Sequence, residues 1–329
     1  MRDLFGFTRR TLGLIAVFAA GCGGGIGPNA PGGLPFTSLQ AARTASPDLT
    51  KPALITLNTS TGALEYWPIK PGGSDQPTTL SGSLGIYQGY GLAANGNVVA
   101  IANYSPAEVV TYNVKTKATK TLVDPYGDPY DIAIDKQGTL YAMNLASVAV
   151  FKSGSSTPSE LSCSYMSTSE GIGVDNEGDV FVNGYGPSSF MGVIEYPAGS
   201  TTCTKPNLKA ERGYPGGVGV DPETDALLVV DNPDQCAGGL EGVMTIYPKP
   251  YNPNTAHRRV LGAMYCAGTF RLNSKSNTIF VSDATVSDGF PIIDQETFPG
   301  AKYEGDYQIG PSPSGSFGGF TTIPNTLPN

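Results

Sequence analysis

The amino-acid sequence predicts an all-β fold in which a unit of four antiparallel strands repeats six times around a ring, a six-bladed β-propeller. The 329 residues include 43 glycines and 27 prolines, and only 15% of them are charged. This composition is typical of short strands joined by many turns. It excludes helical bundles and coiled coils, which need more Ala, Glu, Lys and Leu. Two further observations, a recurring hairpin and a recurring aromatic residue, give the repeat and its number.

Each repeat contains a β-hairpin whose turn begins with an acidic residue in the clearest copies. There an apolar strand ends at an Asp, a short turn follows, and a second apolar strand begins. Asp at the first position of a turn and Gly at the fourth are typical of type I turns. The clearest copies cover residues 131–141, 171–181 and 217–227. Weaker copies cover residues 92–101 and 270–281.

Two sets of marker residues give the number of repeats. The inner strands carry an apolar marker at intervals of 40 to 52 residues: Leu92, Ile132, Ile172, Val218, Phe270 and Phe320. An aromatic residue closes a third strand in every unit: Tyr66, Tyr112, Phe151, Tyr196, Tyr247 and Phe298. Both sets have six members, and four strands at this period are typical of a propeller blade.

The two ends of this domain are expected to share one blade. The first unit, from Ala53 to about Leu80, has strands two to four but no inner strand. The segment 318–325 has an inner strand with no hairpin partner. If the C-terminal strand joins the first blade, the ring closes with six complete blades and no unpaired edge. We therefore assign residues 53–329 to the propeller.

The two hairpins PYDIAIDKQGTLY (129–141) and EGIGVDNEGDVF (170–181) resemble NHL-type repeats and the wider family of six-bladed lactonases and gluconolactonase-like enzymes. The resemblance covers roughly residues 53–325 and implies the propeller fold. For function it is weak, because one fold carries many activities. Enzymes of that family hold a metal ion with Glu, Asn and Asp around the channel, and their ligand pattern is not matched here residue by residue.

Residues 1–21 have the layout of a secretory signal peptide. Arg9 and Arg10 precede a short apolar run, residues 12–20, which is too short to span a bilayer. The arginine pair leaves open whether the general secretory or the twin-arginine route exports the chain. Residues 22–52 follow, rich in Gly, Pro, Ser and Thr, and predict a flexible tether.

The run Ala19-Ala20-Gly21-Cys22 resembles the lipobox of bacterial lipoproteins, a family that usually has Leu at the position of Ala19. The resemblance implies cleavage before Cys22 and lipidation of its thiol. It therefore implies an exported protein of the bacterial cell envelope that contacts a membrane only through its lipid anchor. A secreted protein whose cleavage site happens to adjoin a cysteine is the alternative.

Polar residues are expected at the mouth of the central channel, where the loops that leave the second strands lie. Every unit has Asn or Asp at the end of that strand: Asn58, Asn103, Asn144, Asn183, Asp231 and Asp283. Such side chains either bond the amides of nearby turns or offer oxygen atoms to a polar ligand or a hard cation. The residues to which we assign a possible Ca²⁺ are Asn144, Asn183, Asp231 and Asp283.

Aromatic and acidic residues are expected at the same mouth. An aromatic residue lies at or just before each inner strand: Tyr90, Tyr130, Tyr165, Tyr214, Tyr265 and Phe317. These rings either pack blade against blade or stack on a sugar or a Pro-rich peptide. The acidic residues nearby are Asp124, Asp128, Asp131 and Glu170. They are either solvated surface charges or a site for a metal or a cationic ligand.

The five cysteines predict lipidation at one and disulfides among the other four, as is usual in exported chains. Cys236 and Cys266 fall on the same face of adjacent blades, and we pair them on that ground. Cys163 is then left with Cys203.

These features predict a monomeric, non-catalytic binding or scaffold module that uses its channel-mouth loops for a protein, peptide or glycan of the cell envelope. The net charge of −8 argues against nucleic acid as a partner. No cofactor is expected apart from the candidate Ca²⁺. The alternative is a metal-dependent lactonase-like hydrolase in the channel. His257, the one histidine, belongs to a polar segment expected far from the channel, which argues against a Ser-His-Asp triad.

The lipid anchor can be tested directly. Replacing Cys22 by Ala removes the thiol that would be acylated, so we expect the protein to leave the membrane fraction of the producing cells. Fractionation followed by immunoblotting measures this. Retention of the Cys22→Ala protein in the membrane fraction would contradict the anchor.

Overall fold

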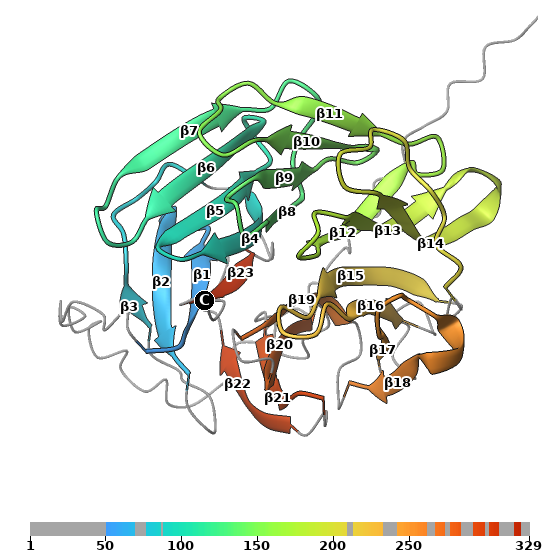
Figure 1. The fold of residues 1–329 in the computed structure, drawn as a ribbon. Coiled ribbons are helices and arrows are strands. Elements are labelled where there is room, and N and C mark those ends of the chain that lie inside the picture. The colour runs from blue at the N-terminus through green and yellow to red at the C-terminus, as the bar shows by residue number, and fades with distance from the viewer. Residues whose placement is uncertain are drawn as a thin grey trace, which may run out of the picture. The chain divides into compact units, whose positions relative to one another are not determined.

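Six antiparallel β-sheets surround a common centre in the computed structural model (Figure 1). The structure describes residues 51–69, 77–86, 88–208, 213–232, 242–261, 267–273, 277–283, 292–299, 303–308 and 319–323. These belong to the compact unit formed by residues 42–329. The signal peptide, Cys22 and the tether up to residue 50 lie outside the described residues.

Each sheet is one blade, and its strands run from the centre outward in a fixed order. Blade 1 contains β23 (Phe320–Ile323), β1 (Ala53–Asn58), β2 (Ala63–Pro68) and β3 (Thr78–Thr79). Blade 2 contains β4 (Gly89–Asn95), β5 (Val98–Asn103), β6 (Glu108–Asn113) and β7 (Thr119–Val123). Blade 3 contains β8 (Asp131–Ile134), β9 (Leu140–Met143), β10 (Ser147–Phe151) and β11 (Ser159–Ser162).

The second half of the ring repeats this plan. Blade 4 contains β12 (Thr168–Val174), β13 (Val180–Gly186) and β14 (Phe190–Tyr196), with the 3-10 helix η1 (Pro187–Ser189) between the last two. Blade 5 contains β15 (Tyr214–Val220), β16 (Leu227–Asn232), β17 (Val243–Tyr247), the 3-10 helix η2 (Pro253–Thr255) and β18 (His257–Val260). Blade 6 contains β19 (Ala267–Leu272), β20 (Thr278–Asp283), β21 (Ile292–Thr297) and β22 (Tyr303–Gln308). In the part of the chain that the structure describes, no helix has the length and apolar character needed to cross a membrane.

The predicted closure of the ring is confirmed. β23 is the inner strand of blade 1 and pairs antiparallel with β1, with Phe320 opposite Thr56 and Ile323 opposite Ala53. Figure 1 shows β23, in red, beside the blue β1. One blade therefore contains strands from both ends of the domain.

Apolar clusters between neighbouring blades hold the ring together. The cluster between blades 2 and 3, for example, joins Val109 and Leu122 to Leu140 and Phe151. The cluster at the seam between blades 6 and 1 consists of Leu54, Trp67, Phe280, Ile293 and Phe320. All five are at most 1% exposed, so the interface between blades 6 and 1 excludes solvent.

The Asp-initiated turns behave as the sequence predicts. Asp135, Asp175 and Asp221 are buried, and each accepts hydrogen bonds from amides of its own turn. Asp175 is the clearest case, because its Oδ1 accepts the N–H groups of residues 177, 178 and 179, each at 2.9 Å. These carboxylates stabilise the hairpins and explain the repeated Asp.

Blade 4 differs from the predicted four strands. Among the residues that the structure describes, its sheet has three strands, and in place of a fourth a single antiparallel bridge joins Glu195 to Thr204. The N–H of each residue donates to the carbonyl of the other, at 3.0 and 2.7 Å. Pro206, which lacks an N–H, follows two residues later and limits further pairing.

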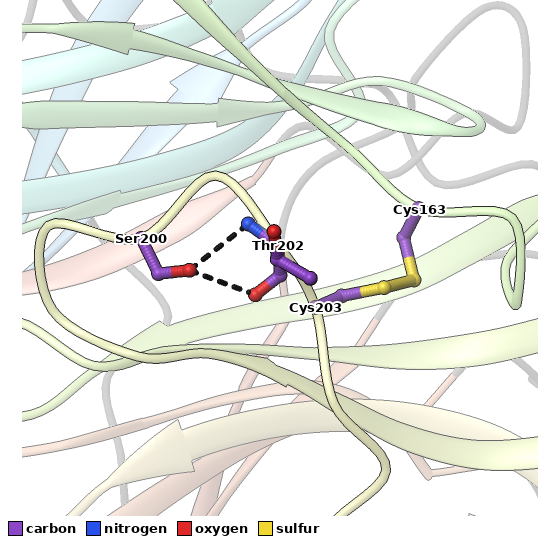
Figure 2. Close-up of a disulfide and its surroundings, with 4 residues drawn as sticks. All are labelled: Cys163, Ser200, Thr202 and Cys203. Carbon is purple, nitrogen blue, oxygen red and sulfur yellow. Dashed lines mark hydrogen bonds between the residues drawn. A yellow bond between two sulfur atoms is a disulfide. The ribbon is translucent and has the colours of Figure 1, made fainter.

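A disulfide fastens this short segment to the neighbouring blade. Cys163, directly after β11 of blade 3, is bonded to Cys203, which confirms the predicted pair (Figure 2). The turn before Cys203 is ordered by Ser200, whose Oγ accepts the N–H of Thr202 at 3.0 Å and donates to its carbonyl at 3.1 Å. Such a cross-link stabilises a fold by about 2–4 kcal/mol. The predicted pair Cys236–Cys266 lies outside the described residues.

The seam gives the first structural prediction. Replacing the fully buried Phe320 by Ala should lower the free energy of unfolding by about 3–5 kcal/mol, because it opens the cluster between blades 6 and 1. Deleting residues 314–329, which removes β23, should lower it further. Denaturant unfolding measures both changes, with the exposed Thr79→Ala in the outermost strand of the same blade as control. An unchanged midpoint for the deletion would contradict closure by β23.

Candidate functional site

The inner strands meet closely around the channel. They contact one another in the cyclic order β23, β4, β8, β12, β15 and β19. Between blades 4 and 5 the backbones touch: a Cβ on Gly171 would lie 2.7 Å from the N of Val218, and a Cβ on Gly173 would lie 2.7 Å from the Cα of Gly219. Larger residues at these two positions would push the blades apart, so the channel is narrow here.

An ion pair crosses the channel between opposite blades. Arg271 in β19 of blade 6 places its Nη2 2.7 Å from Oδ1 of Asp131 in β8 of blade 3. On its way the guanidinium donates from Nε to the carbonyl of Leu92 in blade 2, at 3.0 Å, and from Nη1 to its own neighbour Phe270 at 2.9 Å. Both side chains are largely buried, with 16% and 4% exposed. Three blades are thereby tied together across the axis.

This pair lies between two cavities. The lower cavity has a volume of about 150 Å³. It is lined by Arg271 and by the turns that include Asp135 and Asp175. The upper cavity has a volume of about 340 Å³. It is lined by Asp131 and by residues at the starts of the inner strands. The upper cavity is the predicted mouth. Its wall includes Tyr90, Tyr130, Asp131, Glu170 and Tyr214.

A group of tyrosines forms one side of the mouth. The ring centroids of Tyr90, Tyr104 and Tyr130 lie 5.1–5.6 Å apart, and Tyr90 meets Tyr104 edge to face. Burial raises the pKa of Tyr130, and its contact with Tyr104 raises that pKa further, so the hydroxyl stays neutral at physiological pH. Sequence reasoning missed Tyr104, which directly follows the strand-ending Asn103 and has no counterpart at that position in the other units.

Glu170 in β12 combines access from the cavity with desolvation. Its side chain is exposed within the concave mouth, yet the surrounding protein removes enough water to raise its pKa to about 7. Burial, and then the negative charge of Glu170, raise the pKa of Tyr185 in β13. The Tyr185 ring packs edge to face against Tyr214 at 5.2 Å. Sequence reasoning also missed Tyr185, which lies two residues beyond the strand marker Asn183.

Some of the Asn and Asp residues at the ends of the second strands form hydrogen bonds that stabilise turns or join neighbouring segments. Asn58 accepts the amides of residues 60 and 61, at 3.0 and 3.2 Å. Asn183 donates to the carbonyl of Gly216 in the next blade at 3.1 Å, and Asn144 donates to Asp124 at 3.2 Å. These contacts favour the turn and packing role.

The remaining members of this set leave the calcium hypothesis untested. Asn103 and Asp231 are buried, and the side chain of Asp283 lies outside the described residues. Among the described residues, Oδ1 of Asn103, Asn144 and Asn183 has no hydrogen-bond partner. Calcium at Asn144, Asn183, Asp231 and Asp283 stays a prediction.

The structure separates some predicted site residues from the cavity. Tyr165 is 41% exposed and lies outside the cavity wall, where the ammonium of Lys205 sits 4.1 Å from its ring centroid. Asp124 is buried, and desolvation raises its pKa despite its bonds to Tyr126 and Asn144. Asp128 is exposed. Tyr265 and Phe317 lie outside the described residues.

One acidic group away from the mouth has the spacing of a cation site. Asp175, Glu177 and Asp179 bring their carboxylates within 4.8 Å of one another. Lys249 already reaches this group, with its Nζ 2.9 Å from Asp175 and 3.1 Å from Glu177. Burial alone would raise the pKa of Asp175, but Lys249, the turn amides and Tyr251 together hold it below its usual value. The group is therefore a structural ion-pair network.

His257 lies where the sequence predicts. It begins β18, the outermost strand of blade 5, and is exposed to solvent. It is therefore remote from the channel.

Arg271 is the main feature of the site that sequence reasoning left unused. At its register position the other inner strands carry small residues: Ala93, Ala133, Gly173, Gly219 and Thr321. A single long cation among small residues at a channel-facing position was the available signal.

Comparisons with known proteins bear on the fold. No family model and no curated protein matches this sequence. A propeller in the crystal structure of a nidogen–laminin complex is similar over 84% of this chain and 99% of that chain, with a TM-score of 0.62 and 16% identity. TolB from Acinetobacter baumannii is similar over 84% of this chain and 67% of that chain, with a TM-score of 0.60 and 10% identity. The six-bladed fold is thereby confirmed, while the NHL and gluconolactonase resemblance stays a prediction.

The ion pair across the channel gives the second structural prediction. The single variant Arg271→Met should lose about 3–5 kcal/mol of unfolding free energy, because it leaves the Asp131 carboxylate buried without its cation. Adding Asp131→Asn should restore much of that loss. Denaturant unfolding of both proteins, with the exposed Lys152→Met as control, measures the two losses. Equal losses in the single and double variants would contradict the unpaired Asp131 carboxylate as the cause of the loss.

Proposed function

We propose that this protein is a lipoprotein of the bacterial cell envelope whose propeller binds another protein at the upper cavity. The observation that carries the proposal is the cavity itself. It combines tyrosine rings with two carboxylates, and the Asp131–Arg271 pair lies at its base. Concave sites with mostly apolar walls and a few placed polar groups are typical binding sites.

The exposed aromatic surface favours a protein partner. Tyr214 is 46% exposed at the rim, and Tyr90 and Tyr130 are partly exposed in the wall. Tyrosine is enriched at protein interfaces, where its large ring contributes contact area at little cost in side-chain entropy. A propeller of similar fold is found in the complex of nidogen with laminin, which supports the same class of partner here.

The proposed anchor suits such a role. A tether of about 30 residues that behaves as a random coil spans roughly 30 Å. If Cys22 is lipidated, the propeller can remain attached to a membrane and still turn its upper cavity toward a partner in the surrounding compartment.

Site-specific photo-crosslinking tests the proposal. A photoreactive phenylalanine analogue replaces Tyr214 at the rim, or Lys120 in the outermost strand β7 as the matched exposed control. In irradiated cells that produce the protein, we expect a discrete crosslinked protein from position 214 and none from position 120. Crosslinks of equal yield from both positions, or none from position 214, would contradict binding at the cavity.

A further inference from the structure

We propose that the upper cavity receives the cationic side chain, Lys or Arg, of a peptide segment of the partner. This inference rests on the proposed function, and it names the chemical group that the cavity recognises. Three features carry it: a carboxylate oxygen without a donor, a second carboxylate in the wall, and tyrosine side chains in the same wall.

The first feature is Oδ2 of Asp131. The other oxygen of this carboxylate is fully used, because Oδ1 accepts from Arg271 at 2.7 Å and from the N–H of Ile132 at 2.9 Å. Oδ2 has no hydrogen-bond partner among the described residues and is buried in a side chain that lines the cavity. Leaving such an acceptor unsatisfied is costly, so a donor that enters the cavity gains a charge-assisted bond.

The second feature is Glu170. The Asp131–Arg271 pair is neutral as a whole, so the net negative charge at the cavity comes from Glu170. Among the described residues of the wall there is no Lys, Arg or His to neutralise it. A cation that enters the cavity therefore meets one anionic group and, in the wall, one buried acceptor without a donor, whereas an anion meets repulsion.

The third feature is the aromatic wall. Tyr90, Tyr130 and Tyr214 all line the cavity. The negative face of an aromatic ring attracts an ammonium or guanidinium group, and the ring also covers the alkyl part of a long side chain. A Lys or Arg side chain offers both parts, which fits this wall better than a fully hydrated inorganic ion does.

A metal ion is the competing occupant of two carboxylates. Among the described residues, the one group of three or more acids, cysteines or histidines close enough for a metal is Asp175, Glu177 and Asp179. Asp131 and Glu170 do not belong to such a group. The described wall of the cavity therefore brings together no cluster of three such side chains, and an organic cation suits its two separate carboxylates better.

Charge on Glu170 makes the proposed binding depend on pH. Asp131 in β8 and Tyr214 in β15 share the cavity wall with Glu170, and the charge of Glu170 acts on Tyr185 in β13, which the charge of Asp231 in β16 also reaches. Burial raises the pKa of Tyr185, so that hydroxyl stays neutral at physiological pH. With its own pKa raised to about 7, Glu170 loses its charge in mildly acidic solution. A cation should therefore bind more weakly at pH 6 than at pH 8.

Four short peptides test the inference on the purified protein. They share one sequence, Ac-Gly-Gly-X-Gly-Gly-amide, with Lys, Arg, acetyl-lysine or norleucine at X, and calorimetry or NMR titration measures their dissociation constants. We expect the Lys or Arg peptide to bind at least tenfold more tightly than the acetyl-lysine and norleucine peptides. Replacing Glu170 by Gln should weaken that binding about tenfold and remove its dependence on pH. The matched control is Glu160→Gln, an exposed Glu in the outer strand β11.

The results separate this inference from the proposed function. Asp131→Asn serves as the second variant and should also weaken binding, with circular dichroism verifying its fold. Equal binding of all four peptides, no binding up to millimolar concentration, or full binding by Glu170→Gln overturns the cationic side chain as the ligand. Suppression of Lys- and Arg-peptide binding by micromolar Ca²⁺ overturns it in favour of a metal site. If crosslinks from position 214 still form in any of these cases, the proposed function stands without this inference.

Discussion

The close approach of the inner strands is the constraint on which the rest of the molecule depends. Where Gly171 and Gly173 face blade 5, the backbones are in contact and no side chain fits between them. Six blades can surround one axis at this spacing only if most residues beside the channel are small. Large polar and aromatic side chains that could bind a ligand therefore lie at the ends of the channel, where the loops leave more space. The functional surface of this propeller is an outcome of how tightly its centre is packed.

Arg271 and Asp131 are charged residues in a channel lined mostly by small ones. Their pair lies at the base of the upper cavity and so limits how deep it is. A pair that spans opposite blades needs small neighbours in the same layer, which residues such as Ala133 and Gly219 provide. Its hydrogen bond to Leu92 also fixes the guanidinium against a third blade. The pair therefore has two roles. It links blades on opposite sides of the channel, and it places polar groups at the base of the upper cavity.

Much of the fold was accessible from the sequence because it is periodic. The Asp of each hairpin turn, the apolar inner-strand marker and the closing aromatic residue recur with a local physical cause, so six blades and the closing strand were predicted correctly. Part of the site was accessible for the same reason, since Tyr90, Tyr130 and Tyr214 each lie at or just before an inner strand. Arg271, Tyr104 and Tyr185 were not, because each appears in one blade alone and acquires its role only through a distant partner. In the described part of blade 4, the single bridge that stands in place of a fourth strand likewise depends on the local sequence between Glu195 and Pro206.

The split blade has a consequence for the order of events during synthesis. β23 leaves the ribosome about 260 residues after β1, so blade 1 stays incomplete until nearly all of the domain has been translated. Until then β1 presents unpaired amides and carbonyls, an edge on which other chains can pair. A chain that is translocated unfolded, and folds only on the far side of the membrane, avoids displaying that edge in the compartment where it is made. The same pairing that stabilises the finished ring thus favours late folding of the whole chain over folding blade by blade.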